Sequence, residues 1–249
     1  MYRKSYIVAS LAAFASLYMV ALKFIKGIPV YGIPGAKIKL AVALSPVYGL
    51  VLGPLLGPLS ILIGTLIAMF MFPSSYNLFS IATIFCAPLG ALVSSLILDK
   101  RKIFGLPAWA YSLSIYILLF IAWFMTDVGR KAYIFTAPYT LAVIIMIINI
   151  IARERQWHVR HERAFALLYI LASSVSGILA DHFLGSIEAI IIFRYVLARA
   201  NPNDLAKIYL AAMPLAVTER SFMILIAFIL ELNLYLALRR TKYLLTEVI

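Results

Sequence analysis

Residues 40–98 decide the fold, and they read LAVALSPVYGLVLGPLLGPLSILIGTLIAMFMFPSSYNLFSIATIFCAPLGALVSSLIL. This run of 59 residues contains no Asp, Glu, Lys, Arg or His. A soluble domain of this length would expose charged side chains within it. As one α-helix, rising about 1.5 Å per residue, it would far exceed the roughly 30 Å hydrocarbon core of a bilayer. We therefore predict that it crosses the membrane repeatedly, bending at Gly53-Pro54, Gly57-Pro58 and Pro73-Ser74-Ser75.

The composition of the whole chain agrees with a membrane protein. Of its 249 residues, 64% are hydrophobic and 13% are charged, against about 25% charged in ordinary soluble domains. Backbone groups in lipid must be hydrogen-bonded internally, so only helices or a closed barrel can span it. The apolar stretches are continuous and do not alternate, which favours helices. We predict an all-α polytopic membrane bundle of about six to eight transmembrane helices, with residues 1–249 forming a single integral membrane domain.

The apolar segments between polar or Gly- and Pro-containing breaks predict the positions of the helices. They are expected at 5–24, 38–52, 58–71, 78–98, 109–125, 139–152, 164–180 and 210–238. The Gly- and Pro-rich loop 27–36 is expected to pack against the bundle. Residues 185–198, which Glu188 and Arg194 interrupt, predict one short re-entrant or interfacial helix. Trp109 and Trp123 are expected to anchor the ends of their helix at the two membrane interfaces.

The charge distribution predicts an orientation. The net charge of +12 is explained by Lys and Arg at the ends of spans, where they meet lipid headgroups, so no nucleic-acid partner is expected. With eight crossings, both termini lie on one side. A cytoplasmic placement puts 12 basic residues inside, including the basic loop 153–163, and 10 outside. We predict a multi-pass protein of the cell membrane with both termini in the cytoplasm.

The sequence contains none of the common catalytic motifs. Gly-x-Ser-x-Gly, a Walker-type glycine loop and His-Glu-x-x-His are absent. His158 and His161 have a spacing suitable for metal ligands, but four Arg residues nearby would repel a cation. We therefore predict no catalytic residue, no metal site and no cofactor, and expect that the chain is not an enzyme. Any transport that it supports would draw energy from a partner or an ion gradient.

Glu231 is the clearest ionisable residue within a predicted span. Such a residue costs about 2.5–3.5 kcal/mol on insertion scales, so it needs a reason to be there. It is a candidate substrate-binding residue facing the interior of the bundle. An interhelical hydrogen bond, or a side chain that snorkels toward the basic end of the helix, is an equal alternative.

Further candidate substrate-binding residues lie at the ends of predicted spans. Glu219 and Arg220 stand at the head of the last span, Asp181 follows the helix predicted at 164–180, and Asn77 precedes the helix predicted at 78–98. Asp181, Glu219 and Arg220 could grip a polar ligand from outside, or form ordinary interfacial ion pairs. A third hypothesis, an enzyme or ion-coupled carrier, would require Glu231, Asp181 and His182 to converge on one cavity.

Small residues recur on the first predicted helix. Ala9 and Ala13, like Ala12 and Ser16, are four residues apart and would let another helix approach closely. This spacing suits packing within the bundle, and it also suits docking to a partner subunit.

The Ala-containing first helix and the Gly- and Pro-rich loop precede the run KLAVALSPVYGLVLGPLLGPLSILIG at 39–64. This order resembles the substrate-binding (S) components of energy-coupling factor (ECF) transporters. The resemblance covers about residues 1–100, and Ala212-Met213-Pro214 with Glu219-Arg220 match more loosely. Residues 101–249 then hold additional helices, since members of that family usually have six spans.

The resemblance implies a function and partners. Such components bind a vitamin, a related small organic molecule or a metal ion from outside the cell. Ala9 and Ala13 would dock on a transmembrane coupling protein driven by two ATPase subunits, and Tyr31 and Lys37 would belong to a loop that closes over the site. We therefore expect the substrate-binding subunit of a small-molecule, vitamin-like importer. The alternative is a non-catalytic structural subunit of a larger membrane complex.

Overall fold

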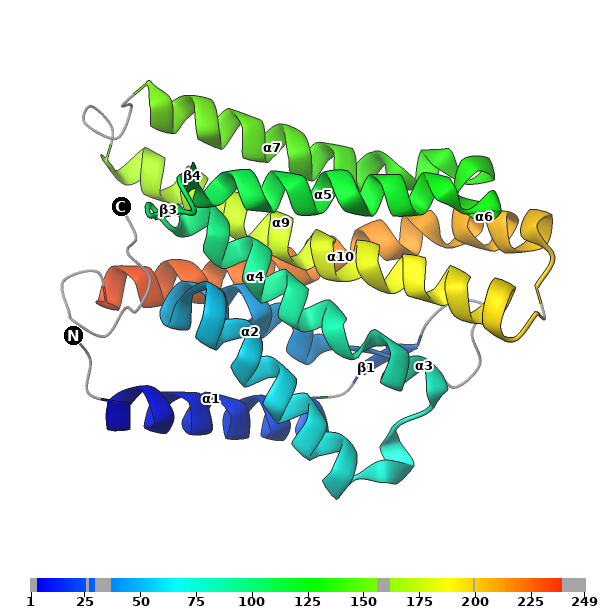
Figure 1. The fold of residues 1–249 in the computed structure, drawn as a ribbon, viewed down its shortest axis with the longest axis horizontal. Helices are drawn as coiled ribbons and strands as arrows, with labels where there is room; N and C mark the ends of the chain where they lie inside the picture. The colour runs from blue at the N-terminus through cyan, green and yellow to red at the C-terminus, as the bar shows by residue number, and fades with distance from the viewer. Residues whose placement is uncertain (1–3, 26, 30–36, 156–161, 199, 239–249) are drawn as a thin grey trace.

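The fold is an all-helical bundle in a computed structural model (Figure 1). The structure describes residues 4–25, 27–29, 37–155, 162–198 and 200–238. Two short antiparallel hairpins interrupt the helices. Strand β1 (Gly27–Pro29) pairs with β2 (Lys37–Lys39), and β3 (Lys102–Ile103) pairs with β4 (Leu106–Pro107).

The helices follow one another through short connections. The first half of the chain holds α1 (Lys4–Phe24), η1 (Leu40–Leu44), α2 (Ser45–Met71), η2 (Pro73–Ser75), α3 (Leu78–Ala82), η3 (Thr83–Phe85) and α4 (Cys86–Leu98). The second half holds α5 (Ala108–Met125), α6 (Asp127–Lys131), η4 (Tyr133–Thr136), α7 (Ala137–Glu154), α9 (Glu162–Ile190), η5 (Ile191–Val196) and α10 (Pro202–Leu238).

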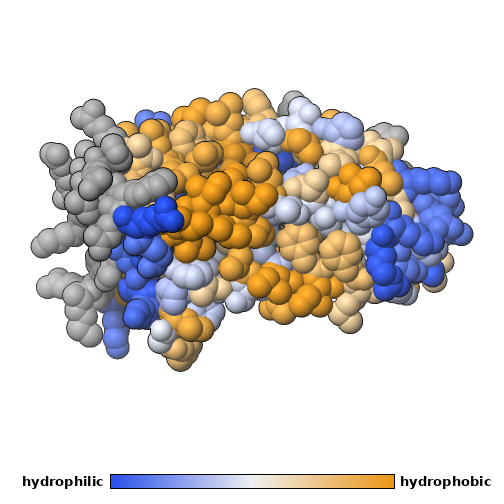
Figure 2. Space-filling model, turned by 90° about the horizontal axis from the view of Figure 1, so that it is seen from above, coloured by the Kyte–Doolittle hydropathy of each residue, from blue (hydrophilic) through white to orange (hydrophobic). Residues whose placement is uncertain are grey.

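Seven helices among the described residues are long and apolar enough to cross a membrane. Figure 2 shows a broad band of apolar surface between polar surfaces at the two ends. An apolar band between polar ends is what a bilayer requires of the surface that it surrounds. The prediction of a polytopic helical bundle with about six to eight spans is confirmed, and the protein is a multi-pass membrane protein.

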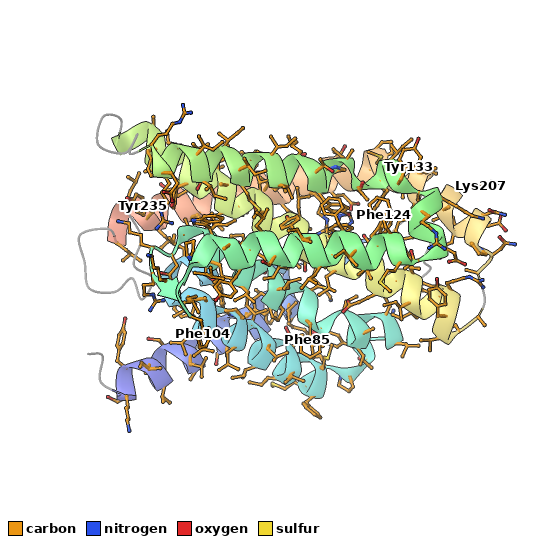
Figure 3. The ribbon with its side chains drawn as sticks, turned by 45° about the horizontal axis from the view of Figure 1, so that its top comes forward. Phe85, Phe104, Phe124, Tyr133, Lys207 and Tyr235 are labelled. Carbon is orange, nitrogen blue, oxygen red and sulfur yellow. The ribbon has the colours of Figure 1, made fainter. Side chains whose placement is uncertain are left out.

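The bundle has two ends that differ in what they contain. Helix α1 begins and α10 ends at one of them, here called the terminal end (Figure 1). Figure 3 shows Phe104 and Tyr235 toward the terminal end and Tyr133 and Lys207 toward the opposite end, here called the distal end. Which of these ends faces the cytoplasm stays a prediction.

The chain turns sharply at Gly53 within α2. Its φ of 79° and ψ of −174° lie in a region that glycine enters at little cost. A Cβ at Gly57 would lie 2.8 Å from the carbonyl oxygen of Tyr48, so the two arms of α2 fold against each other. The bend predicted at Gly53-Pro54 is confirmed, as is the turn at 73–75, which is η2. The turn predicted at Gly57-Pro58 is wrong, because both residues lie inside α2.

Helix α9 is much longer than the sequence predicts. The helix predicted at 164–180 continues through Asp181 to Ile190 and then into the π-helix η5. The separate short helix predicted at 185–198 is therefore wrong. The polar residues of this segment interrupt its hydropathy, but the helical backbone continues through them, and the side chain of Glu188 has a partner in α4.

Helices α4 and α9 cross at two glycines, and this crossing positions the interior of the bundle. A Cβ at Gly90 would lie 2.8 Å from the carbonyl oxygen of Gly177, and one at Gly177 would lie 2.8 Å from that of Gly90. Such close approach of two helices is typical of small residues in membrane bundles. It brings Asp181, one turn beyond Gly177, against the N-terminal part of α4.

The largest apolar core lies among α4, α5, α7 and α9. Trp123 is completely buried there and stacks on Phe135, with ring centroids 5.5 Å apart. The predicted interfacial role of Trp123 is therefore wrong. The residue is near the end of its helix, but η4 and α10 cover it.

Candidate functional site

A cavity of about 390 Å³ opens among α2, α3, α9 and α10 in the distal half of the bundle. This volume falls within the range of small-ligand pockets. Six aromatic side chains line it: Tyr18, Tyr76, Phe79, Phe135, Phe193 and Tyr209. Most of its surface is apolar, so its few polar groups are the ones that would orient a ligand.

A buried ion pair between α9 and α10 lines the cavity. One Nη of Arg220 lies 3.4 Å from Oδ2 of Asp181, and the two residues are 4% and 5% exposed. The same Nη also lies 3.4 Å from Sδ of Met223. Taking two charges out of water costs several kcal/mol per ion, and mutual attraction offsets this cost only when the geometry is good. At 3.4 Å, the attraction between Arg220 and Asp181 offsets only part of the free energy that burying the two charges costs.

Two polar atoms beside this ion pair are buried without a hydrogen-bond partner among the described residues. They are Nε of Arg220 and Oε1 of Glu219. Glu219 is 7% exposed and also lines the cavity. Each buried unpaired donor or acceptor costs about 1–3 kcal/mol. One unpaired donor and one unpaired acceptor therefore belong to residues that line the cavity.

A second polar contact joins α4 to α9 at the same cavity. The thiol of Cys86 donates to Oε2 of Glu188, with Sγ and Oε2 3.0 Å apart. Cys86 lines the cavity and is 6% exposed. Nothing in the sequence predicts this pair, because the two residues are 102 positions apart. The feature of the sequence that points to a polar contact here is Glu188, an acidic residue inside an otherwise apolar segment.

Hydrogen bonds fix the aromatic wall of the cavity. The hydroxyl of Tyr139 lies 3.0 Å from Nδ1 of His182. The hydroxyl of Tyr209 donates to the carbonyl oxygen of Ser186 at 2.7 Å. Phe193 joins the wall from the π-helix η5, a kind of helix found often at functional sites. These bonds hold His182 and Tyr209, which both line the cavity, whereas Tyr139 lies outside its lining.

Lys39 and Tyr76 contribute further polar groups to the lining. Lys39 ends β2, and its Nζ lies 5.7 Å from the centroid of the Tyr76 ring. Such a cation–π contact is worth about 0.5–1 kcal/mol when exposed. Burial raises the pKa of the Tyr76 hydroxyl, which therefore remains a proton donor at neutral pH.

A polar clamp at the distal end holds α6 against η5. Nε of Arg194 donates to Oδ2 of Asp127 at 3.1 Å, and the hydroxyl of Tyr195 donates to Oδ1 at 3.0 Å. Partial burial acts to raise the pKa of Asp127, but these two bonds outweigh it and hold the pKa below its usual value. The clamp ties η5, which carries Phe193, to the neighbouring helix.

The structure brings three of the predicted site residues together. Asp181, Glu219 and Arg220 all line the cavity, with His182 beside them. Tyr31 lies outside the described residues. Lys37 forms part of β2, and only its backbone is described. Asn77 does not line the cavity. Its Oδ1 instead caps α3, accepting from the backbone N–H of Ser80 at 2.9 Å.

Glu231 lies away from this cavity, completely buried between α9 and α10. The hydroxyl of Ser173 donates to its Oε1 at 2.8 Å, and the hydroxyl of Ser174 donates to its Oε2. The interhelical hydrogen bond considered as the alternative is thus formed. A substrate-binding role for Glu231 finds no support in this position, and the convergence of Glu231, Asp181 and His182 on one cavity does not occur.

The small residues of α1 lie on its outer face. Ala9, Ala12, Ala13 and Ser16 are all exposed. The buried face of α1 is a different one, formed by Ala15, Tyr18, Ala21 and Leu22. The Ala9–Ala13 pair therefore does not pack against the described residues of this chain. Its use in docking stays a prediction.

Comparisons with known proteins name no function. No family model matches the chain, and no solved structure matches it. Over 192 residues the chain is 30% identical to the uncharacterized protein MJ0923 of Methanocaldococcus jannaschii. The aligned part covers 76% of this chain and 58% of that protein, so the chain spans less than two thirds of the length of this relative.

Proposed function

We propose that this protein is the membrane-embedded substrate-binding subunit of a small-molecule importer. The observation that carries the proposal is the 390 Å³ cavity whose polar groups are buried and partly unpaired. Structural polar groups inside a bilayer are normally satisfied, as Glu231 is here. A cavity that leaves Glu219 and Arg220 with unused hydrogen-bonding capacity is what a site awaiting a ligand requires.

The lining supports a particular kind of ligand. Six aromatic side chains suit a flat, largely apolar body. Oε1 of Glu219 and Nε of Arg220 call for a hydrogen-bond donor and an acceptor on the same ligand. A vitamin-like organic molecule offers both features, whereas a bare metal ion does not use the aromatic lining. In addition, the described residues include no cluster of three metal-ligating side chains.

The position of the cavity supports an uptake role. It lies in the distal half of the bundle, away from the start of α1 and the end of α10. If both termini are cytoplasmic, as the distribution of basic residues predicts, the site faces the outside of the cell. The hairpin β1–β2 ends at Lys39, which lines the cavity.

The energy for transport would come from partner subunits. The sequence contains no nucleotide-binding motif, and the exposed Ala9–Ala13 face of α1 gives a coupling protein a surface for close helix contact. We assign the coupling to a transmembrane partner driven by two ATPase subunits. We assign no catalytic role to this chain.

Affinity purification from native membranes in mild detergent tests this assembly. Mass spectrometry of the tagged chain should find one transmembrane partner and two ATPase subunits in stoichiometric amounts. The variant with Ala9→Leu and Ala13→Leu should lose them, because larger side chains hold the helices apart. The matched control is Ala211→Leu, at an exposed position of α10, and it should retain them. Recovery of the chain with none of these subunits would count against the importer.

A further inference from the structure

A second hollow lies between α7 and α10, with α9 as its floor. Its volume is about 270 Å³. Both α7 and α10 pack against α9 but barely against each other, which leaves the groove between them. Pro138, Leu141 and Ile145 line it from α7, and Val175, Leu179 and His182 form the floor. Figure 3 shows Tyr133, just before α7, at the end of the bundle nearest to the groove.

Helix α10 presents one complete face to this groove. The contributing residues recur at the three- and four-residue spacing of a single helix face. They are Met213, Ala216, Val217, Arg220, Ser221 and Ile224. The adjacent face of α10 lines the ligand cavity, and Ala216 and Arg220 belong to both. One helix, together with Phe135 and His182, thus forms the wall between the two spaces.

The mouth of the groove faces the lipid. Leu141 is 54% exposed and Val217 is 40% exposed, and both lie within helices that cross the membrane. Further in, the hydroxyl of Tyr139 and Nδ1 of His182 are hydrogen-bonded to each other, and an Nη of Arg220 contacts Asp181. The lining that remains is predominantly aliphatic. The aliphatic part of the lining favours an apolar occupant, since apolar cavities of about 150 Å³ stay dry and take up apolar ligands.

We propose that the α7–α10 groove is a binding site for one hydrocarbon chain of a membrane lipid. The medium at its mouth is hydrocarbon, its lining is apolar, and three helices enclose it. A chain seated there would support the wall formed by Phe135, Ala216 and Arg220 from behind. This inference stands apart from the proposed import function and does not require it.

Trp123 provides a reporter for the occupant of the groove. It is completely buried, so bulk lipid does not touch it, and it stacks on Phe135 in the groove wall. Bromine atoms on a lipid chain quench indole fluorescence only at short range. We would replace Trp109 and Trp157 by Phe, which leaves Trp123 as the reporter, and reconstitute the chain in vesicles of phosphatidylcholine with brominated or unbrominated acyl chains.

The brominated chains should quench at least half of the Trp123 emission. Ser221→Phe, which places a ring in the groove, should restore most of the Trp123 emission. Val217→Phe should do the same, as a second and independent way to block the groove. The matched control is Thr218→Phe, at an exposed position of α10 that does not line the groove. It should leave the quenching unchanged. Circular dichroism checks that each variant keeps its helices.

Two results would overturn the proposal. One is Trp123 emission that is the same in brominated and unbrominated vesicles. The other is quenching that both blocking variants, correctly folded, leave as strong as the parent does, since the chain would then reach Trp123 by another route.

Discussion

The same pair of helices, α9 and α10, encloses two buried sites with ionisable side chains, and the sites differ in how fully those side chains are hydrogen-bonded. Arg220 and Glu231 are eleven residues apart on α10, about 16 Å along the helix axis. Glu231 receives hydrogen bonds from Ser173 and Ser174 and does not line the ligand cavity. Arg220 makes one long contact with Asp181, keeps an unpartnered Nε and lines the cavity.

This contrast separates a structural role from a binding role. A polar group inside a bilayer that has all its partners stabilises helix packing and needs nothing more. A polar group with unused donors, beside an aromatic cavity, has a capacity that folding alone does not use. The two sites should therefore respond differently when their charges are removed.

The largest effect is expected from Arg220→Met. This change leaves the carboxylate of Asp181 buried without its cation, and breaking a buried pair in this way costs about 3–5 kcal/mol. The thermal unfolding midpoint in detergent should fall markedly. The double variant Asp181→Asn with Arg220→Met removes both charges and should recover most of the lost stability. A single variant as stable as the parent would show that the pair is not buried as described.

A smaller loss is expected from Glu231→Ala. The change removes two interhelical hydrogen bonds, each worth about 0.6–1.7 kcal/mol in a membrane bundle, so the stability should fall by about 1–3 kcal/mol. Ligand retention should not change. The control is Asn233→Ala, because Asn233 is exposed and, among the described residues, donates to the carbonyl oxygen of Ile229 in its own helix. If Glu231→Ala lost the ligand and kept the unfolding midpoint of the parent, Glu231 would have a binding role and not the structural role assigned to it.

The contact between Cys86 and Glu188 is expected to contribute less to stability than Glu231 does and more than Asp127 does. Cys86→Ala removes the thiol that donates to Glu188 and should cost about 1 kcal/mol. Cys86→Ser keeps a donor and should cost less. Both are measured as unfolding midpoints in detergent. Equal midpoints for the parent and both variants would mean that this contact contributes nothing to the joining of α4 and α9.

The smallest effect is expected at the exposed clamp around Asp127. Because its pKa in the folded protein lies below the usual value near 3.9, the ionised carboxylate stabilises the fold above that usual value. This contribution is lost as the pH falls through the lowered pKa. Asp127→Asn should therefore lower the unfolding midpoint slightly at pH 7 and have no effect well below pH 3. A difference between parent and variant that stays constant with pH would contradict the assignment.

The helical character of the chain and most of its spans could be predicted from hydropathy. Residues 40–98 carry no charge, so helices that cross the membrane could be predicted for them. The bend at Gly53 could be predicted from the Gly53-Pro54 pair. The extent of α9 could not be predicted, because Asp181 looks like the end of a span until its partner Arg220 is known. Trp123 likewise looks interfacial by position, and only the packing of η4 and α10 buries it.

The candidate site was predictable in part. Asp181, Glu219 and Arg220 stood out as charges at the ends of predicted spans, and they do lie together. Glu231 stood out as an ionisable residue within a predicted span, yet two uncharged serines satisfy it. Nothing in a single sequence distinguishes a charge that has found partners from one that has not, since the partners lie on another helix.

The most direct measurement is the identity and amount of small molecule that the purified chain carries. The chain is purified from native membranes, denatured, and its extract is analysed by mass spectrometry. The account predicts one organic compound in near-stoichiometric amount, retained in Glu231→Ala and lost in the stable Asp181→Asn, Arg220→Met double variant. A compound retained equally by all three proteins, or no compound in the parent, would contradict it.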